Sequence, residues 1–157
     1  MGGAPGRDLR DTALIAVDTN VLVAAHRRDA ERHDVAADTV RSLAQGAARW
    51  AIPWACLHEF LAMVTHPRIF DPPSTVDQAI DQVTAWLESP SLELLAERFD
   101  HWEHLRTLVS EGDVRGGRVH DARVAAVCLA HGVTTLLTAD RDFGRFPRLR
   151  VSNPLVG

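Results

Sequence analysis

Acidic side chains follow two predicted strands of this 157-residue chain. Asp18 comes after the run 14–17, Leu-Ile-Ala-Val, which is typical of a strand buried on both faces of a parallel sheet. Asp140 follows a second predicted strand, 134–138, after one intervening alanine. Because α/β proteins place their ligand sites at the carboxyl ends of parallel strands, we expect both acids at one edge of the sheet. Carboxylates gathered there could hold a divalent cation.

Glu59 is the most unusual acid, because its neighbours in a predicted helix over 55–65 are nearly all apolar. An unpaired buried carboxylate is costly, and no arginine or lysine lies within one helical turn of Glu59. We therefore predict a metal ion as its partner, the alternative being an arginine distant in the sequence. Asp121 repeats the anomaly at the start of an apolar helix over 120–130.

Each of the other acids also has an ordinary structural interpretation. Asp18 or Asn20 could cap the helix that follows them, and Asp121 could cap its own helix. Asp140 and Asp142 are of a residue type common in turns. The metal interpretation is favoured because two strands place acids at the same edge and an apolar helix carries another.

The donor atoms indicate which ion to expect. Carboxylate oxygens without a convergent set of histidines and cysteines favour Mg²⁺ or Mn²⁺. His101 and His104 share a helix face but lack the second pair of ligands that zinc needs. His120 is better interpreted as facing the substrate or orienting a ligand. The sequence contains neither a glycine-rich phosphate loop nor a serine nucleophile elbow.

The elements that must position these acids alternate between strands and helices. Besides the segments above, we predict a helix over 33–45, strands at 50–53 and 91–95, a helix with Ser74 as its N-cap, a helix that begins at Phe99 and ends at Gly112, and a fifth strand near 149–151. Such alternation implies right-handed crossovers and a parallel sheet. The predicted fold is a three-layer α/β/α sandwich around a central parallel sheet of four to five strands. It spans residues 14–157 and follows a flexible tail at 1–13.

Bulk composition is that of a globular protein, with 46% hydrophobic and 24% charged residues. No apolar run approaches the roughly 20 residues that span a bilayer. Cys56 and Cys128 lie in apolar helical stretches and are predicted to be buried thiols in a reducing compartment, so we expect a cytoplasmic protein. The net charge of −4 argues against broad electrostatic capture of nucleic acid, although local basic patches remain open.

Arginines near the acids in sequence are the candidates for local phosphate binding, since the chain has no lysine. Arg115, Arg118 and Arg123 surround Asp121 in the sequence, and their planar guanidinium groups suit phosphate oxygens. The alternative is that these arginines lie on a solvated loop and helix face.

These residues together resemble the signature of PIN-domain ribonucleases, most closely the VapC toxins of bacterial VapBC toxin–antitoxin pairs. The resemblance extends over residues 14–151. The matching segments, in order, are Ile15-Ala-Val-Asp18-Thr-Asn20, Glu59 in an apolar helix, Val119-His-Asp121-Ala-Arg-Val-Ala, and Leu137-Thr-Ala-Asp140-Arg-Asp142-Phe143. Residues 1–13 precede the point where such toxins usually begin.

The resemblance implies an α/β/α nuclease that cleaves RNA with Mg²⁺ or Mn²⁺ as the toxin of a type II pair. It further implies a VapB-like antitoxin as partner and a homodimer, without a membrane segment. The site residues that it implies are a catalytic and metal-binding quartet of Asp18, Glu59, Asp121 and Asp140, an accessory acid at Asp142, and supporting polar groups at Asn20 and Thr138.

Three other functions compete with this interpretation. A PIN-type nuclease with a housekeeping role in RNA processing would have the same chemistry. A phosphoacceptor signalling domain of flavodoxin-like fold would also gather acids around Mg²⁺, but it needs a lysine late in the chain. A catalytically dead binding module ought to have lost one of the four acids, and all four are present.

Overall fold

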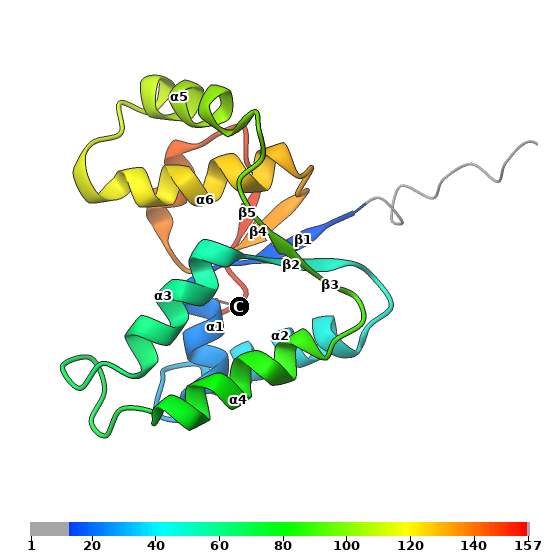
Figure 1. Ribbon diagram of the computed structural model, residues 1–157, viewed down its shortest axis with the longest axis vertical. Helices are drawn as coiled ribbons and strands as arrows, with labels where there is room; N and C mark the ends of the chain where they lie inside the picture. The colour runs from blue at the N-terminus through cyan, green and yellow to red at the C-terminus, as the bar shows by residue number, and fades with distance from the viewer. Residues whose placement is uncertain (1–12, 157) are drawn as a thin grey trace, which may run out of the picture.

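The computed structural model describes residues 13–156 (Figure 1). The predicted flexible tail at 1–13 lies, apart from Ala13, outside the described residues. The central sheet contains five strands, all parallel, in the order β3-β2-β1-β4-β5. Their bounds are β1 Ile15–Val17, β2 Trp50–Pro53, β3 Leu92–Leu95, β4 Thr135–Leu137 and β5 Val151–Ser152. The predicted parallel sheet is therefore confirmed, and each strand begins within two residues of its expected position.

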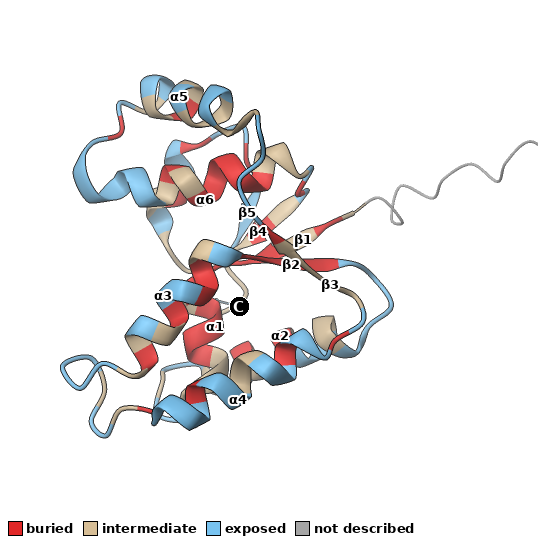
Figure 2. Ribbon diagram, viewed as in Figure 1, coloured by how far each residue is buried: buried red, intermediate tan, exposed pale blue. Residues whose placement is uncertain are grey.

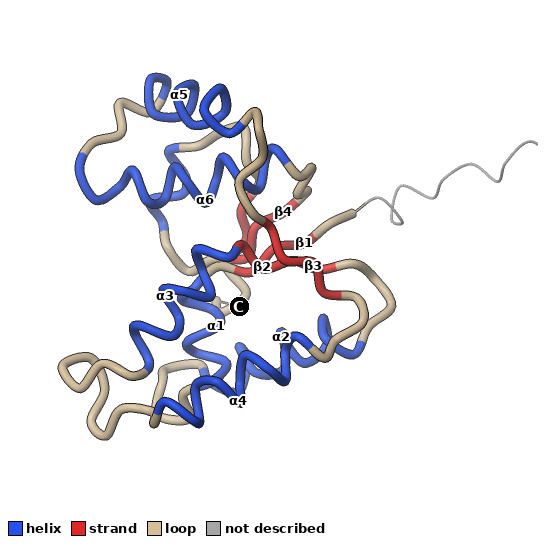
Figure 3. Tube along the Cα trace, viewed as in Figure 1, coloured by secondary structure: helices blue, strands red, loops and turns tan. Residues whose placement is uncertain are grey.

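Helices cover both faces of this sheet, as the predicted three-layer sandwich requires (Figures 1 and 3). One layer contains α1 Thr19–His26, α2 His33–Gln45, α3 Trp54–Val64 and α4 Val76–Leu87, and the other contains α5 His101–Glu111 and α6 Val119–Ala130. The chain winds outward from β1 to β3 and then returns to place β4 on the other side of β1. The topological switch point therefore lies between β1 and β4, where such sheets bind ligands. Flavodoxin-like domains have the order 2-1-3-4-5, so the strand order excludes the phosphoacceptor alternative.

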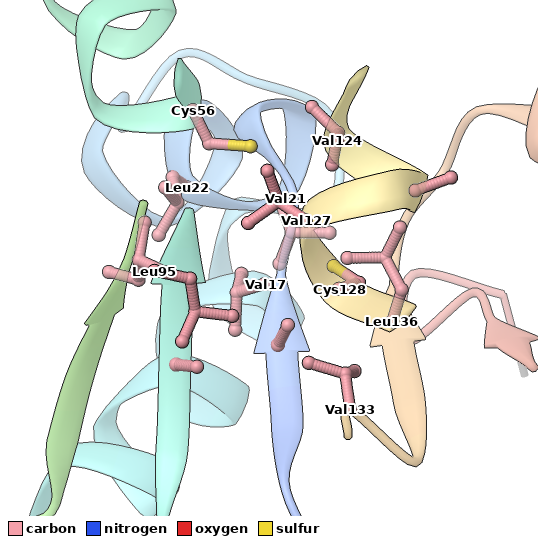
Figure 4. Packing of buried hydrophobic residues seen from close by; sticks show 14 of the residues in the cluster. Val17, Val21, Leu22, Cys56, Leu95, Val124, Val127, Cys128, Val133 and Leu136 are labelled. Carbon is pink, nitrogen blue, oxygen red and sulfur yellow. The ribbon is translucent and has the colours of Figure 1, made fainter. Parts of the chain in front are cut away.

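The core fills the space between the sheet and the two helical layers (Figure 2). Strand β2 is buried along its whole length. In α6, six of the seven residues at 122–128 are small or apolar and buried, the exception being residue 123. Figure 4 shows the Cys56 thiol near the carboxyl ends of the strands and the Cys128 thiol over the middle of the sheet. Both cysteines are free and buried, as predicted. Within the described residues, no helix is both long and apolar enough to cross a bilayer.

The N-terminus of α4 corrects one local prediction. Thr75, not Ser74, is the N-cap, and it forms a reciprocal capping box with Gln78. Ser74 is buried instead, with its hydroxyl 2.9 Å from Nε2 of His26 and accepting a hydrogen bond from Arg27. Because the Ser74 hydroxyl is engaged by His26 and Arg27, the helix begins one residue later than the sequence predicts.

The helix predicted from Phe99 is shorter than expected. It begins at His101, leaving Phe99 in the preceding turn with 94% of its surface exposed, and Trp102 is 65% exposed. The predicted loop before α6 contains a short 3₁₀ turn at Gly116–Arg118, and a second 3₁₀ turn, Arg141–Arg145, follows β4.

Candidate active site

Asp18 and Asp140 lie at the carboxyl ends of the two strands that flank the switch point. The register pairs Ile15 with Thr135 and Val17 with Leu137, so β1 and β4 end at the same level. The backbone N–H of Asp18 continues this pairing by donating to the carbonyl of Leu137 at 2.9 Å. Parallel pairing therefore brings together two acids that are 122 positions apart in the sequence.

The carboxylate of Asp18 is buried and held by donors from two other elements. Thr138 Oγ1, just after β4, donates to Oδ2 at 2.8 Å, and Cys56 Sγ, on α3, donates to Oδ1 at 3.4 Å. Asp18 occupies the N-cap position of α1 but makes no side-chain capping hydrogen bond. The capping interpretation therefore does not apply to Asp18.

Asn20 joins the ends of the two central strands. Its Nδ2 group donates to Oδ2 of Asp18 at 3.4 Å and to Oγ1 of Thr138 at 3.3 Å, while its Oδ1 accepts from the backbone N–H of Ala139 at 3.0 Å. The Thr138 hydroxyl also accepts from the backbone N–H of Asp140 at 3.0 Å. Asn20 and Thr138 thus lie where supporting groups were expected, and Asn20 lies within α1 rather than capping it.

Three of the acids converge closely. One carboxylate oxygen each from Asp121, Asp140 and Asp142 lies within 4.8 Å of the others. Asp140 also acts as a turn residue, because its Oδ1 accepts from the backbone N–H of Asp142 at 2.9 Å. Asp121 lies in the first turn of α6, whose N-cap is Arg118, so Asp121 is not the cap. The turn interpretation of Asp140 is therefore correct and still leaves its second oxygen free for a ligand.

Glu59 requires a correction, because it is exposed and not buried in an apolar helix. The predicted helix has a solvent-facing side that includes Trp54, His58 and Ala62. Among the described residues, no arginine, lysine or histidine lies within 4 Å of the Glu59 carboxylate. Partial desolvation and, to a lesser extent, the charge of Asp18 raise the pKa of Glu59, so the two carboxylates lie close enough to interact electrostatically.

We call Asp18, Glu59, Asp121, Asp140 and Asp142 the acidic cluster. Burial raises the pKa of Asp18, with a smaller contribution from the charge of Asp140. Partial burial raises the pKa of Asp121 to about 6, and the charges of Asp140, Asp18, Asp142 and Glu59 add to this effect. Each member of the acidic cluster thus either has a raised pKa or contributes its charge to raising the pKa of another member, which is the signature of mutual repulsion.

The cluster fits a divalent cation on the chemistry of its donors. Its ligands are hard carboxylate oxygens, and within residues 13–156 the only cationic side chain within 4 Å of any member is Arg118, 3.9 Å from Asp142. The buried hydroxyl of Thr19 lies near enough to lower the pKa of Glu59, yet it has no hydrogen-bond partner among the described residues. Uncompensated negative charge and an unsatisfied oxygen both favour a bound metal ion.

The three candidate arginines have different environments. Only Arg118 approaches the acidic cluster, through Asp142. Arg123 is paired with Glu97, after β3, and Arg115 is paired with Asp113 at 3.1 Å on an exposed loop. The sequence could not distinguish the three arginines, because it shows only their spacing from Asp121. Sequence reasoning also missed the contact of Cys56 with Asp18, for which the only signal was the position of Cys56 one turn before Glu59 on the same helix.

Comparison with known proteins gives consistent matches over most of the chain. A family model described as "PIN domain" matches residues 15–149. The "VapC ribonuclease Mb2897" of Mycobacterium bovis is 37% identical over 144 residues, which cover 92% of this chain and 97% of the relative. "Ribonuclease VapC43" of Mycobacterium tuberculosis matches to the same extent. Among solved structures, a chain of the promoter-DNA-bound VapBC2 complex of Rickettsia felis superposes with a TM-score of 0.64 at 22% identity, covering 89% of this chain and 98% of that one.

Proposed function

Because this chain belongs to the PIN-domain family, we propose that it is an endoribonuclease whose acidic cluster holds a divalent ion, Mg²⁺ or Mn²⁺. The observation that carries this proposal is the acidic cluster at the topological switch point, in which one carboxylate oxygen each of Asp121, Asp140 and Asp142 lies within 4.8 Å of the others and one arginine lies at the margin. Curated relatives at 37% identity are named ribonucleases, which supports RNA as the substrate.

The division of labour that we propose within the acidic cluster is the one that the resemblance to PIN-domain ribonucleases implies. We assign the catalytic and metal-binding roles to Asp18, Glu59, Asp121 and Asp140, and an accessory role to Asp142. When bound, a divalent ion supplies positive charge that activates water and stabilises the charge developing on the attacked phosphate. The protein supplies carboxylates in fixed positions, which is the condition for placing the ion and the phosphate accurately.

Hydrogen bonds provide that fixed geometry. Thr138 and Cys56 restrain the two oxygens of Asp18, and the backbone N–H of Asp142 restrains Oδ1 of Asp140. Asn20 ties the loop after β4 to the start of α1, so the two strand ends cannot separate without breaking its hydrogen bonds. One carboxylate oxygen each of Asp121, Asp140 and Asp142 lies close to the other two, beside a sheet edge that these hydrogen bonds hold together.

Phosphate binding needs positive charge, because the cluster alone repels RNA. Arg118 is the best-placed arginine, being 44% exposed and 3.9 Å from Asp142. A phosphate that approached the bound ion could accept hydrogen bonds from this guanidinium group. Arg115 and Arg123 are weaker candidates, since each is already paired with a carboxylate.

The biological role that we propose is that of a toxin in a type II toxin–antitoxin pair. The relatives carry the VapC name, and the structural neighbour was solved as a VapBC complex on its promoter DNA. The partner would then be a VapB-like antitoxin that blocks the acidic cluster, and a homodimer is the expected assembly.

The direct test is incubation of the purified protein with total RNA, followed by mapping of new RNA ends. We expect cleavage with Mg²⁺ or Mn²⁺, none with EDTA, and none with Asp18→Asn, which retains the size of the side chain but loses its charge. Asp38→Asn, at an exposed ion pair on α2, is the matched control and should cleave normally. Full activity of Asp18→Asn at saturating Mg²⁺ would contradict the proposal.

A further inference from the structure

The 3₁₀ turn Arg141–Arg145 begins directly after Asp140, at the sheet edge that carries the acidic cluster. A 3₁₀ helix has three residues per turn, so side chains three positions apart lie in one row along its axis. Phe143, Phe146 and Leu149 are buried at this spacing. The backbone N–H of Phe146 donates to the carbonyl of Phe143 at 3.1 Å, and that of Leu149 donates to Phe146 at 2.9 Å. The segment therefore keeps a period of three residues, with one row in the core.

A second row of the same segment starts at Asp142, a member of the acidic cluster. Arg145 is the next position of this row, about 6 Å further along the axis at a rise of roughly 2.0 Å per residue. The position after it, Arg148, reaches the end of α5, where Glu111 accepts two hydrogen bonds of 2.9 and 2.6 Å from its guanidinium group. The backbone of Arg145 itself lies beside Gly112, which ends α5. Arg145 is therefore located between the acidic cluster and the C-terminus of α5.

The side chain of Arg145 is exposed and has no ion-pair partner within residues 13–156. Arg115, Arg123 and Arg148, by contrast, are each paired with a carboxylate. The surface beside Arg145 is open, because no atom lies within 4 Å of the position that a Cβ would take on Gly144. The guanidinium group of Arg145 is thus available to a ligand.

Arg118 reaches the same acid from a different element. It ends the 3₁₀ turn before α6, and its guanidinium group lies 3.9 Å from the carboxylate of Asp142. Arg145 belongs to the row of Asp142 but lies beyond ion-pair distance from it. The two arginines therefore present positive charge at different distances from the acidic cluster, which suits two phosphates of one strand better than one phosphate.

We propose that Arg145 binds a phosphate of the RNA strand next to the phosphate that is held at the acidic cluster, so that the strand crosses the 3₁₀ turn toward the end of α5. This inference rests on the proposed function and adds a substrate-binding residue and a path for the strand. A planar guanidinium group can donate two parallel hydrogen bonds to phosphate oxygens. Because the acidic cluster repels the backbone of the RNA, positive charge just beyond the cluster is where it contributes most to binding.

The first experiment measures binding of an unstructured RNA oligonucleotide by fluorescence anisotropy at several salt concentrations, in an Asp18→Asn background that prevents cleavage. Adding Arg145→Ala should weaken binding about fivefold at low salt, the effect of one exposed ion pair, and should reduce the slope of log affinity against log salt by about one. Arg145→Lys should restore the slope, because lysine keeps the charge. Arg118→Ala combined with Arg145→Ala should reduce the slope by about two, since the two arginines contact different phosphates.

A second experiment identifies the phosphate that Arg145 contacts. One phosphate of the oligonucleotide at a time is replaced by an uncharged methylphosphonate. At one position the replacement should weaken binding to the Asp18→Asn protein but should cause no further loss once Arg145→Ala is added. The position at which Arg118→Ala removes the sensitivity should be a different one.

Arg68 provides the matched control, because it is exposed, has no ion-pair partner among the described residues and lies in the loop at the end of α3 that points away from the sheet (Figure 1). Arg68→Ala removes the same charge and should leave the salt slope unchanged. Thermal melts of each variant establish that it is folded.

The inference is overturned by an unchanged salt slope in Arg145→Ala, by an equal change in Arg68→Ala, or by a methylphosphonate profile that Arg145→Ala does not alter at any position. Any of these results, obtained alongside RNA cleavage by the unmodified protein, leaves the proposed function standing. Absence of cleavage by the unmodified protein contradicts the proposed function.

Discussion

The thiol of Cys56 donates a hydrogen bond to Oδ1 of Asp18 at 3.4 Å, and both side chains are buried. This contact joins α3 to the end of β1 at the topological switch point. Burial, together with the charge of Asp18, holds the pKa of the Cys56 thiol well above its ordinary value. The thiol therefore remains a proton donor, and its role is to restrain a carboxylate rather than to react.

Replacing Cys56 should reveal this role. Cys56→Ala leaves one oxygen of a buried carboxylate without a donor, so we expect the free energy of unfolding to fall by about 1–3 kcal/mol. Cys56→Ser retains a donor and should recover part of the loss, in stability and in Mn²⁺ affinity alike. Urea unfolding and Mn²⁺ titration of both variants provide the measurements. If the alanine and serine variants have equal stability and equal Mn²⁺ affinity, the hydrogen bond contributes to neither.

Metal binding should be visible in thermal melts without any substrate. At ten times its dissociation constant, an ion that binds only the folded protein adds about 1.4 kcal/mol, or roughly 3–6 °C in melting temperature. Asp140→Asn preserves the acceptor for the Asp142 N–H but removes one charge, so the melting temperature should rise in EDTA and the shift with Mn²⁺ should shrink. If Mn²⁺ moves neither melt, the acidic cluster is not a metal site.

Repulsion in the acidic cluster predicts how stability depends on pH in EDTA. The pKa of Asp121 is raised to about 6 from its ordinary value of 3.8, so the folded state binds this proton more tightly than the unfolded state. The stabilisation is therefore fully present below about pH 4 and is lost as the pH rises through 6. Melts between pH 4 and 7 should show a steeper decline for the unmodified protein than for Asp121→Asn. The exposed-site control Asp38→Asn should retain the steep decline.

Replacing Arg118 and Arg123 one at a time should show which of them contacts the RNA phosphates. Arg118→Ala should weaken RNA binding and reduce the slope of log affinity against log salt by about one, as expected for one lost phosphate contact. Arg123→Ala breaks the exposed ion pair with Glu97, so it should change the free energy of unfolding by at most about 1 kcal/mol and leave the salt slope intact. Anisotropy titrations at several salt concentrations measure both slopes. The opposite ranking would assign the phosphate contact to Arg123.

Expression in a bacterium without the antitoxin gene should arrest growth. Co-expression of the short reading frame expected just upstream should restore growth, because the proposed antitoxin would block the acidic cluster. Asp18→Asn is the control and should be harmless at equal protein level. Normal growth with demonstrably active protein would favour the housekeeping alternative for this nuclease.

Much of the fold follows from local chemistry that the sequence displays directly. The runs at 14–17 and 50–53 are apolar without alternation because both faces of a parallel strand are buried, and they form β1 and β2. Asp18 and Asp140 could be placed at one sheet edge because parallel strands share a direction, which makes the carboxyl end of each strand predictable without coordinates. The helix over 33–45 was predicted at its observed bounds from its apolar periodicity and the glycine that follows it.

Other features depended on contacts between distant segments, and local pattern could not supply them. Glu59 was expected to be buried because its neighbours in sequence are apolar, but tertiary packing covers only the other side of α3 and leaves Glu59 exposed. Ser74 has the chemistry of an N-cap, yet His26 and Arg27 bind its hydroxyl and Thr75 caps the helix. The sequence by itself determined which residues carry charge and where strands end. Only the tertiary structure decided which side of each helix faces the solvent and which donor meets which carboxylate, because both depend on how the layers pack.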